Sequence, residues 1–216
     1  MTNITRYTYI YLHGFASSPN SSKAQYFKQQ LEQHKQNVII PDLNMNDFTN
    51  LTLSRQLEQV SKIVESAHHP VIMFGSSMGG LTATILAEKY GTNIAKLILL
   101  APAFRMSELW AAGNEADLEQ WQLNGKHAIM HYGYDKKINL DYAFYLDLFN
   151  HNDKNFSREC PSLIFHGIHD DVVPIEYSRE YTQSNLLAKL IELDDDHSLG
   201  KDLPSMWTTI KKFCEL

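Results

Sequence analysis

The sequence predicts an α/β protein with a mostly parallel sheet of about six strands and helices on both faces of the sheet. Short apolar runs recur along the chain, and most are continuous, as in strands that are buried on both faces. Segments with helical periodicity alternate with these runs, which is typical of right-handed strand–helix–strand units. The length of 216 residues suits one compact domain, so we expect residues 1–216 to form a single unit.

The composition is that of an ordinary globular protein, with 44% hydrophobic and 20% charged residues. A net charge of −6 argues against a nucleic-acid or anionic-membrane partner, because phosphates would repel the protein. The richest apolar stretch, residues 97–104, is too short to span a bilayer, and no signal-peptide pattern follows residues 1–6. We expect a cytoplasmic protein in which Cys160 and Cys214 are small core residues.

Apolar runs that are too short to form helices are the predicted strands. They are residues 9–12, 38–40, 71–74, 97–100, 163–165 and 190–193. Between the first two runs, Ser22 and Gln25 match a capping box. The apolar residues Ala24, Phe27 and Leu31 lie on one face of the helix that this box predicts.

Further helices follow from apolar periodicity and from end signals. Apolar residues recur on one face across residues 53–67. Another helix is predicted from about Ser77 to Tyr90, where Gly91 occupies the position after the helix end. Asp202 can cap a last helix, whose apolar stripe spans residues 203–213.

One segment departs from this alternation. Roughly sixty residues separate the strand at 97–100 from the strand at 163–165, and a structureless loop of that length is improbable. The segment is rich in tryptophan, tyrosine and phenylalanine. We therefore expect a helical insertion at about 104–156 that forms a lid over the strand ends.

Residues 75–79, Gly-Ser-Ser-Met-Gly, match the pattern G-x-S-x-G. The apolar strand at 71–74 runs directly into this pattern, and a helix begins on its central serine. That context is the nucleophile elbow of α/β-hydrolases, in which small flanking residues permit a tight turn. An alternative is a glycine-rich turn in which Ser76 or Ser77 caps the helix. A phosphate-binding loop is a weaker alternative, because its G-x-x-x-x-G-K-[ST] pattern is missing from the sequence. We interpret Ser77 as a nucleophile.

A serine hydroxyl needs an adjacent histidine to take its proton. In this fold the chain order is serine, acid, histidine, and the histidine follows the last strand. His197 comes directly after residues 194–196, three aspartates at the end of the predicted strand 190–193. The alternatives are a surface histidine in an acidic turn or a metal site with the aspartates. We predict His197 as the base.

The acid is expected after the strand at 163–165, where residues 166–174 begin with His-Gly and end at Pro174, which can start a helix. Asp170 is the predicted acid. Asp171 is its close rival, and Asp147 in the insertion is a weaker one. The alternative for Asp170 is a residue that caps an Asx turn.

Two backbone N–H groups must face the oxyanion that develops during acyl transfer. One is expected from Met78, which follows the nucleophile. The other is expected from Phe15, because Gly14 lets the loop after strand 9–12 turn in closely. The side chains of Phe15 and Met78 are not required for this role. For His13 we expect an orienting hydrogen bond within the loop.

Several blocks of the sequence resemble the YqiA/YcfP-like group of small α/β-hydrolases. They are residues 11–19, with Lys23-Ala24 shortly after, residues 41–43, 75–80 and 166–174, and the pair Asp196-His197. The resemblance implies the α/β-hydrolase fold with few strands before the oxyanion loop, and esterase activity on short acyl esters or thioesters. It also supports Ser77, Asp170 and His197 as the triad.

The predicted function is a carboxylesterase or thioesterase that acts through Ser77, His197 and Asp170 and an acyl-enzyme. We expect a small-molecule ester or thioester substrate with a small or apolar acyl group, and neither a cofactor nor a metal. The alternatives are another triad reaction (lactone, peptide or carbon–carbon bond hydrolysis, or acyl transfer) and a non-catalytic binding protein. Nothing in the sequence predicts the oligomeric state, the acyl length or movement of the lid.

Overall fold

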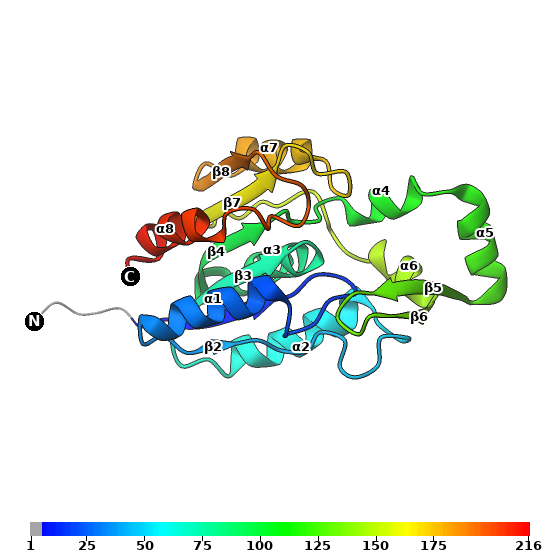
Figure 1. The fold of residues 1–216 in the computed structure, drawn as a ribbon, viewed down its shortest axis with the longest axis horizontal. Helices are drawn as coiled ribbons and strands as arrows, with labels where there is room; N and C mark the ends of the chain where they lie inside the picture. Colours follow the sequence, from blue (N-terminus) through cyan, green and yellow to red (C-terminus); the bar gives the residue numbers. More distant parts are fainter. Residues whose placement is uncertain (1–5) are drawn as a thin grey trace, which may run out of the picture.

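The central feature of the computed structural model, which describes residues 6–216, is a six-stranded sheet with the order β2-β1-β3-β4-β7-β8 (Figure 1). All neighbouring strands in it are parallel. The strands are β1 (Thr8–Leu12), β2 (Val38–Ile39), β3 (Val71–Ser76), β4 (Ile94–Leu100), β7 (Ser162–Gly167) and β8 (Ala188–Leu193). This arrangement confirms the predicted mostly parallel sheet of six strands.

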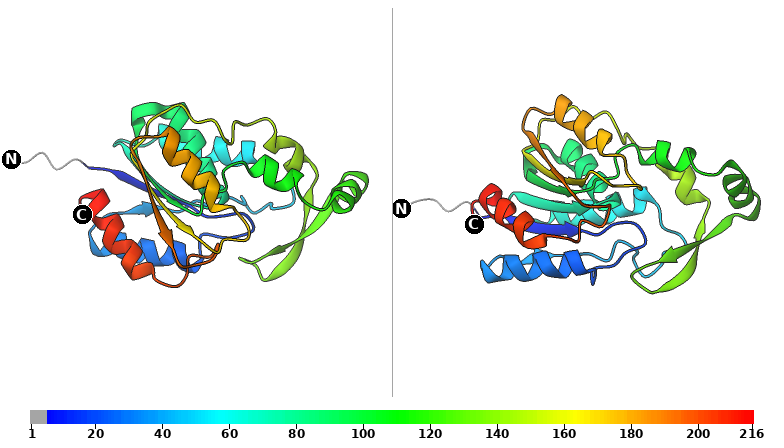
Figure 2. Two further views of the ribbon diagram at one scale, coloured as in Figure 1. Left: turned by 90° about the horizontal axis from the view of Figure 1, so that it is seen from above. Right: turned by 45° about the horizontal axis from the view of Figure 1, so that its top comes forward.

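Helices cover both faces of the sheet because successive strand residues point to opposite sides. Tyr9 and Tyr11 of β1 belong to one apolar cluster, whereas Ile10 and Leu12 belong to the other. The first cluster includes α1 (Ser22–Gln33) and α8 (Leu203–Cys214), which lie together on one face (Figure 2). The second includes α2 (Leu53–Glu65), α3 (Met78–Tyr90) and α7 (Ile175–Ser184). A short 3₁₀ turn, η1 (Gly91–Asn93), follows α3.

The helix ends follow the predicted signals, with one shift. The N-cap of α1 is Ser21 and not Ser22, because the Ser21 hydroxyl accepts the N–H of Ala24. Asp202 caps α8 by accepting the N–H of Ser205, as predicted. The predicted end of α3 at Gly91 is also confirmed, and this glycine has a positive φ of 53°.

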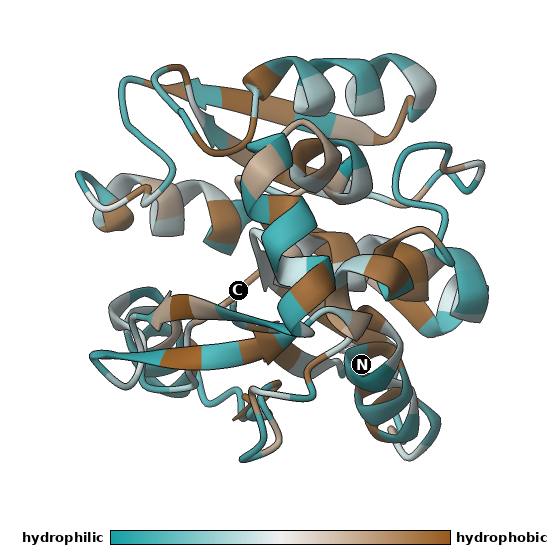
Figure 3. Cartoon of the chain, turned by 90° about the vertical axis from the view of Figure 1, so that its right-hand side faces the viewer, coloured by the Kyte–Doolittle hydropathy of each residue, from teal (hydrophilic) through white to brown (hydrophobic). Residues whose placement is uncertain are grey.

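The segment between β4 and β7 contains α4 (Met106–Ala111), α5 (Glu115–Asn124), β5 (Lys126–His131), β6 (Lys136–Asp141) and α6 (Ala143–Leu148). It projects beyond one end of the sheet (Figures 1 and 2). The predicted helical insertion contains three helices, but it also contains strands, because β5 and β6 form an antiparallel hairpin that the sequence did not predict. Exposed and less exposed residues alternate along β5, which is the period of a half-covered strand. Figure 3 shows that both hydrophobic and hydrophilic residues lie along the hairpin.

The two cysteines, Cys160 and Cys214, are free and buried, as expected of core residues. They belong to the apolar clusters on opposite faces of the sheet. Across residues 6–216, no helix combines the length and the hydropathy needed to cross a bilayer.

Candidate active site

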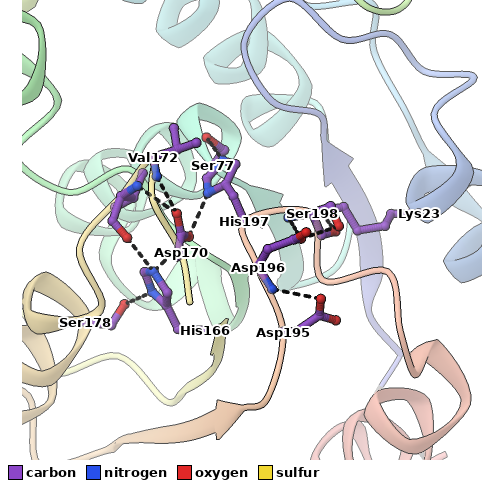
Figure 4. Close-up of polar contacts among 11 residues, drawn as sticks. Lys23, Ser77, His166, Asp170, Val172, Ser178, Asp195, Asp196, His197 and Ser198 are labelled. Carbon is purple, nitrogen blue, oxygen red and sulfur yellow. Dashed lines mark hydrogen bonds and ion pairs between the residues drawn. The ribbon is translucent and has the colours of Figure 1, made fainter. Parts of the chain in front are cut away.

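The predicted site residues follow four different strands and meet at one edge of the sheet. Ser77 follows β3, Asp170 follows β7 and His197 follows β8. The loop with Phe15 follows β1. Because all of these strands are parallel, their carboxyl ends lie at the same edge, where α/β proteins bind ligands. The structure brings the three side chains of Ser77, Asp170 and His197 together there (Figure 4).

Ser77 lies at a strained turn between β3 and α3. Its φ of 52° is rare for a residue with a side chain, and such strain is common at functional sites. Glycine is required on both sides of the turn. A Cβ atom at Gly79 would lie 2.3 Å from the carbonyl oxygen of Leu12, and one at Gly75 would lie 2.4 Å from the carbonyl oxygen of Gly79. In the described part of the chain, the Ser77 hydroxyl makes no capping hydrogen bond, so the alternative of a simple helix cap at Ser77 was wrong.

The Ser77 hydroxyl, the His197 ring and the Asp170 carboxylate form a chain of hydrogen bonds. Ser77 Oγ lies 3.1 Å from His197 Nε2, and His197 Nδ1 lies 2.7 Å from Asp170 Oδ2. Since a carboxylate only accepts, Nδ1 carries the hydrogen and Nε2 is free to accept the serine proton. The Asp170 side chain is completely buried, whereas that of His197 is 24% exposed. This geometry permits the serine to be activated as a nucleophile.

Each oxygen of the Asp170 carboxylate lies close to two nitrogen atoms. Oδ1 accepts the backbone N–H groups of Val172 at 2.9 Å and Val173 at 2.8 Å, and Oδ2 lies near rings of both His197 and His166. Burial by itself would raise the pKa of Asp170, but the hydrogen bonds from His166 and His197 outweigh it and hold this pKa well below its ordinary value. The carboxylate therefore stays ionised.

Two other aspartates and an Asx turn at Asp170 were the alternatives for the acid. Asp171 is exposed on the loop. Asp147 lies in α6, where it accepts hydrogen bonds from Ser54. The Asx turn considered for Asp170 is present as well, because Oδ1 accepts the N–H of Val172 while Oδ2 faces the histidine.

The loop that carries His197 is fixed by its own aspartates. Asp195 is buried and accepts the N–H of Asp196, and Asp196 accepts the N–H of Ser198. Lys23 of α1 donates to the carbonyl oxygen of Ser198 at 2.6 Å (Figure 4). The residues from 6 to 216 contain no group of three side chains able to hold a metal ion, so the aspartates belong to the loop and to no such cluster.

Two backbone N–H groups beside Ser77 are unoccupied. A Cβ atom at Gly14 would lie 3.3 Å from Ser77 Cβ, so the loop after β1 passes directly against the serine. Within residues 6–216, neither the N–H of Phe15 nor that of Met78 donates a hydrogen bond to another residue. Both groups are thus available to a ligand oxygen. Free backbone donors beside the serine are one requirement of an oxyanion hole.

His13 orders the same loop. Its Nδ1 lies 2.9 Å from the carbonyl oxygen of Gly14, and its Nε2 accepts the N–H of Leu43 at 3.0 Å. The ring is buried, and both nitrogens are satisfied by backbone groups. This is the orienting contact expected for His13 from the sequence.

A cavity of about 280 Å³ opens beside Ser77. Among the described residues that line it, Ser77 is the only one with a polar side chain. The apolar lining includes Ala103, Met106, Leu109, Trp110, Val172 and Val173. Such a cavity favours an uncharged, apolar group next to the serine.

The ring of Phe15 connects this loop to the inserted segment. Its centroid lies 5.2 Å from that of Phe144 in α6 and 5.5 Å from that of Trp110 in α4. The sequence assigned no role to this side chain. Its position in an aromatic cluster means that the inserted segment helps to hold the loop that offers the Phe15 N–H.

The tip of the hairpin also contacts this loop. The N–H of Gly133 donates to the carbonyl oxygen of Ala16 at 3.3 Å. A Cβ atom at Gly133 would lie 2.8 Å from Ser18 Cβ and 3.1 Å from the carbonyl carbon of Ser17. Glycine at this position therefore allows the hairpin to dock against residues 16–18.

Replacing Gly133 with valine is expected to displace the hairpin from this loop and lower the kcat of a reaction at Ser77 by roughly 10- to 100-fold, because small misplacements of binding groups are costly in catalysis. Steady-state kinetics and Tm would measure the effect. Ala128→Val, on an exposed position of the same hairpin, is the control. Equal activities of the two variants would contradict the docking role.

Solved structures share this fold at low sequence identity. Est1E from Butyrivibrio proteoclasticus, with ferulic acid bound, superimposes with a TM-score of 0.85 at 21% identity and covers 98% of this chain and 89% of that chain. Alpha/beta hydrolase domain-containing protein 10 from mouse gives a TM-score of 0.81 at 19% identity, over 96% and 89% of the two chains. A monoacylglycerol lipase from Paleococcus ferrophilus gives 0.73 at 15% identity, over 96% and 92%.

These similarities confirm the predicted α/β-hydrolase fold. The family model described as "Uncharacterised protein family (UPF0227)" matches residues 8–215, nearly the whole chain. The chain therefore belongs to the UPF0227 family, the YqiA/YcfP family whose sequence blocks it resembles.

Proposed function

We propose that this protein is a serine hydrolase that cleaves carboxylic esters or thioesters with an apolar acyl group through an acyl-enzyme. The observation that carries the proposal is the hydrogen-bonded chain from Ser77 Oγ through His197 to Asp170, at 3.1 and 2.7 Å, beside an apolar cavity. The strained turn at Ser77 supports it, because it presents the hydroxyl above the sheet.

In the first half of the reaction, Ser77 Oγ attacks the acyl carbon and His197 Nε2 takes the serine proton. A bond forms between Oγ and the acyl carbon, and the carbonyl oxygen becomes an oxyanion held by the N–H groups of Phe15 and Met78. His197 then gives its proton to the leaving oxygen or sulfur. The bond to that atom breaks, and the alcohol or thiol departs.

In the second half, a water molecule takes the place of the leaving group. His197 accepts a proton from the water as its oxygen attacks the acyl carbon. The bond to Ser77 Oγ breaks, the serine recovers its proton from His197, and the carboxylic acid leaves. Asp170 stays ionised throughout and stabilises the protonated ring of His197.

The lining of the cavity supports the proposed substrate class. A volume of about 280 Å³ with an apolar lining suits a small-molecule ester whose acyl group is aliphatic or aromatic. The names of similar structures are consistent with an ester: one is Est1E with ferulic acid bound, and another is a monoacylglycerol lipase. We expect the protein to act on such a molecule in the cytoplasm, without a cofactor.

Labelling with a fluorophosphonate probe tests the proposal, because the probe reacts with an activated serine whatever the natural substrate. We expect a single adduct by intact mass, mapped to Ser77, followed by turnover on p-nitrophenyl esters and acyl thioesters. Comparison of acetyl, butyryl and octanoyl substrates would measure the acyl preference. Folded protein that gains no adduct would overturn the proposal.

A further inference from the structure

A second histidine contacts the carboxylate that orients His197. His166 lies at the end of β7, and its side chain is completely buried. Its Nε2 lies 3.1 Å from Asp170 Oδ2, the same oxygen that His197 contacts, and 2.9 Å from the carbonyl oxygen of Val173. Its Nδ1 lies 2.8 Å from the hydroxyl of Ser178 in α7 (Figure 4).

These contacts fix the position of the hydrogen on the ring. Nε2 faces only a carboxylate oxygen and a carbonyl oxygen, which are both acceptors, so Nε2 carries the hydrogen. Nδ1 faces the Ser178 hydroxyl, which can donate to it. The Nε2–H group therefore donates to the Val173 carbonyl oxygen and lies 3.1 Å from Asp170 Oδ2, while Nδ1 is satisfied by Ser178.

We propose that His166 is a positioning residue for the hydrolase proposed above, which fixes the Asp170 carboxylate and thereby sets how strongly His197 accepts a proton. The inference rests on the proposed function for its effect on turnover. The contacts that carry it involve the Asp170 carboxylate, the carbonyl oxygen of Val173 and the hydroxyl of Ser178.

The need for a second donor comes from burial. A carboxylate without access to water must have its lone pairs satisfied by the protein. Oδ1 accepts two backbone N–H groups from its own loop, whereas within residues 6–216 the donors close to Oδ2 are the two histidine rings. Without His166, the negative charge on Oδ2 would be shared with His197 alone. His197 would then hold its proton more strongly, and activity would be lost at a higher pH.

The end of β7 contacts both Asp170 and the loop that carries His197. His166 supports Asp170, and the next residue, Gly167, is pressed against the loop of His197, where a Cβ atom would lie 2.3 Å from the carbonyl oxygen of Asp195. The strand thus fixes the acid and the loop of the base relative to one another. This role explains why the polar residue His166, and not an apolar one, lies buried near the end of β7.

Other charged groups near this arrangement come from three elements: Lys23 from α1, Asp196 from the His197 loop and Glu192 from β8. Glu192 is paired with Arg179 at 2.7 Å. None of these groups is altered by a substitution at residue 166. A difference in pH dependence between variants at position 166 therefore reports on the contact with Asp170.

The test compares pH–rate profiles of the wild type with those of His166→Leu and His166→Gln. We expect His166→Leu, which lacks the donor, to lower kcat by roughly 10- to 100-fold with little change in KM. Its loss of activity at low pH should move up by about half a unit to one unit. The amide of His166→Gln restores a donor, so most of both effects should be reversed. Ser162→Ala, a buried serine on the same strand that does not contact Asp170, is the control.

A second variant and a second measurement keep the inference testable. If His166→Leu does not fold, Ser178→Ala provides the test. This variant removes the partner of His166 Nδ1, so the hydrogen can leave Nε2. We expect the pH–rate profile to shift in the same direction by a smaller amount. NMR titration of the His197 ring should show the same shift without any turnover. A wild type without a Ser77 adduct would overturn the proposed function but leave this titration informative. Identical titrations in wild type, His166→Leu and Ser178→Ala would overturn the role of His166.

Discussion

Replacing Ser77 with alanine is expected to lower kcat for ester hydrolysis on the order of a millionfold, because no other group can form the acyl-enzyme. Stability should change little. The hydroxyl makes no capping bond in the described part of the chain, and alanine would adopt the same positive φ with a similar strain. Active-site titration, steady-state kinetics and Tm of the purified variant would measure both outcomes. The fluorophosphonate adduct should disappear with the activity.

Ser76 offers a matched control for this substitution. It is the preceding serine of the same turn and is almost completely buried, but it ends β3 and does not contact His197. Ser76→Ala should keep most of the activity. If Ser76→Ala were inactive and Ser77→Ala active, the position of the nucleophile would be wrong by one residue.

Patterns that depend on a few neighbouring residues could be predicted from the sequence. Most strands of the sheet are continuous apolar runs. The turn at Ser77 requires glycine at 75 and 79 because a Cβ atom at either position would lie within 2.4 Å of a backbone carbonyl oxygen. The order of Ser77, Asp170 and His197 then followed from the order of the strands. Local sequence was sufficient here because parallel strands bring their carboxyl ends to one edge.

The hairpin in the inserted segment could not be predicted in the same way. β5 and β6 are only half covered, and their lysines, histidines and asparagine make the apolar alternation weak. Their pairing depends on the turn between them, where Asp135 has a φ of 49°. The aromatic residues of the segment do not indicate its secondary structure. Tyr132, for example, lies in the turn between β5 and β6 and is 78% exposed.

The sequence also did not predict contacts that depend on the conformation of a loop or that join distant parts of the chain. Nothing local distinguishes His166 as a partner of Asp170, because that contact requires the loop of residues 167–173 to fold back over the strand. The docking of Gly133 against residues 16–18 joins segments more than half the chain apart. The four-residue spacing of His166 and Asp170 predicts this contact only when the conformation of the loop between them is known.

Replacing Asp170 with asparagine is expected to lower kcat by about 10⁴-fold, whereas Asp171→Asn should leave it nearly unchanged. Val172 and Val173 donate to one side-chain oxygen at position 170, so the amide oxygen of asparagine would stay there. Its NH₂ group would then face His197 Nδ1 as a donor. The His197 ring must then carry its hydrogen on Nε2. A protonated Nε2 can no longer accept the proton of Ser77.

The same variant should also lose stability in a pH-dependent way. Hydrogen bonds from His166 and His197 hold the pKa of Asp170 below its value in the unfolded chain, about 3.9, so the ionised carboxylate stabilises the fold above that pH. This contribution disappears as the pH falls through the folded-state pKa. The difference in Tm between wild type and Asp170→Asn should therefore be large at pH 7 and shrink toward pH 3. An inactive Asp171→Asn beside a fully active Asp170→Asn would move the acid to the neighbouring residue, and a Tm difference independent of pH would argue against the hydrogen-bonded carboxylate.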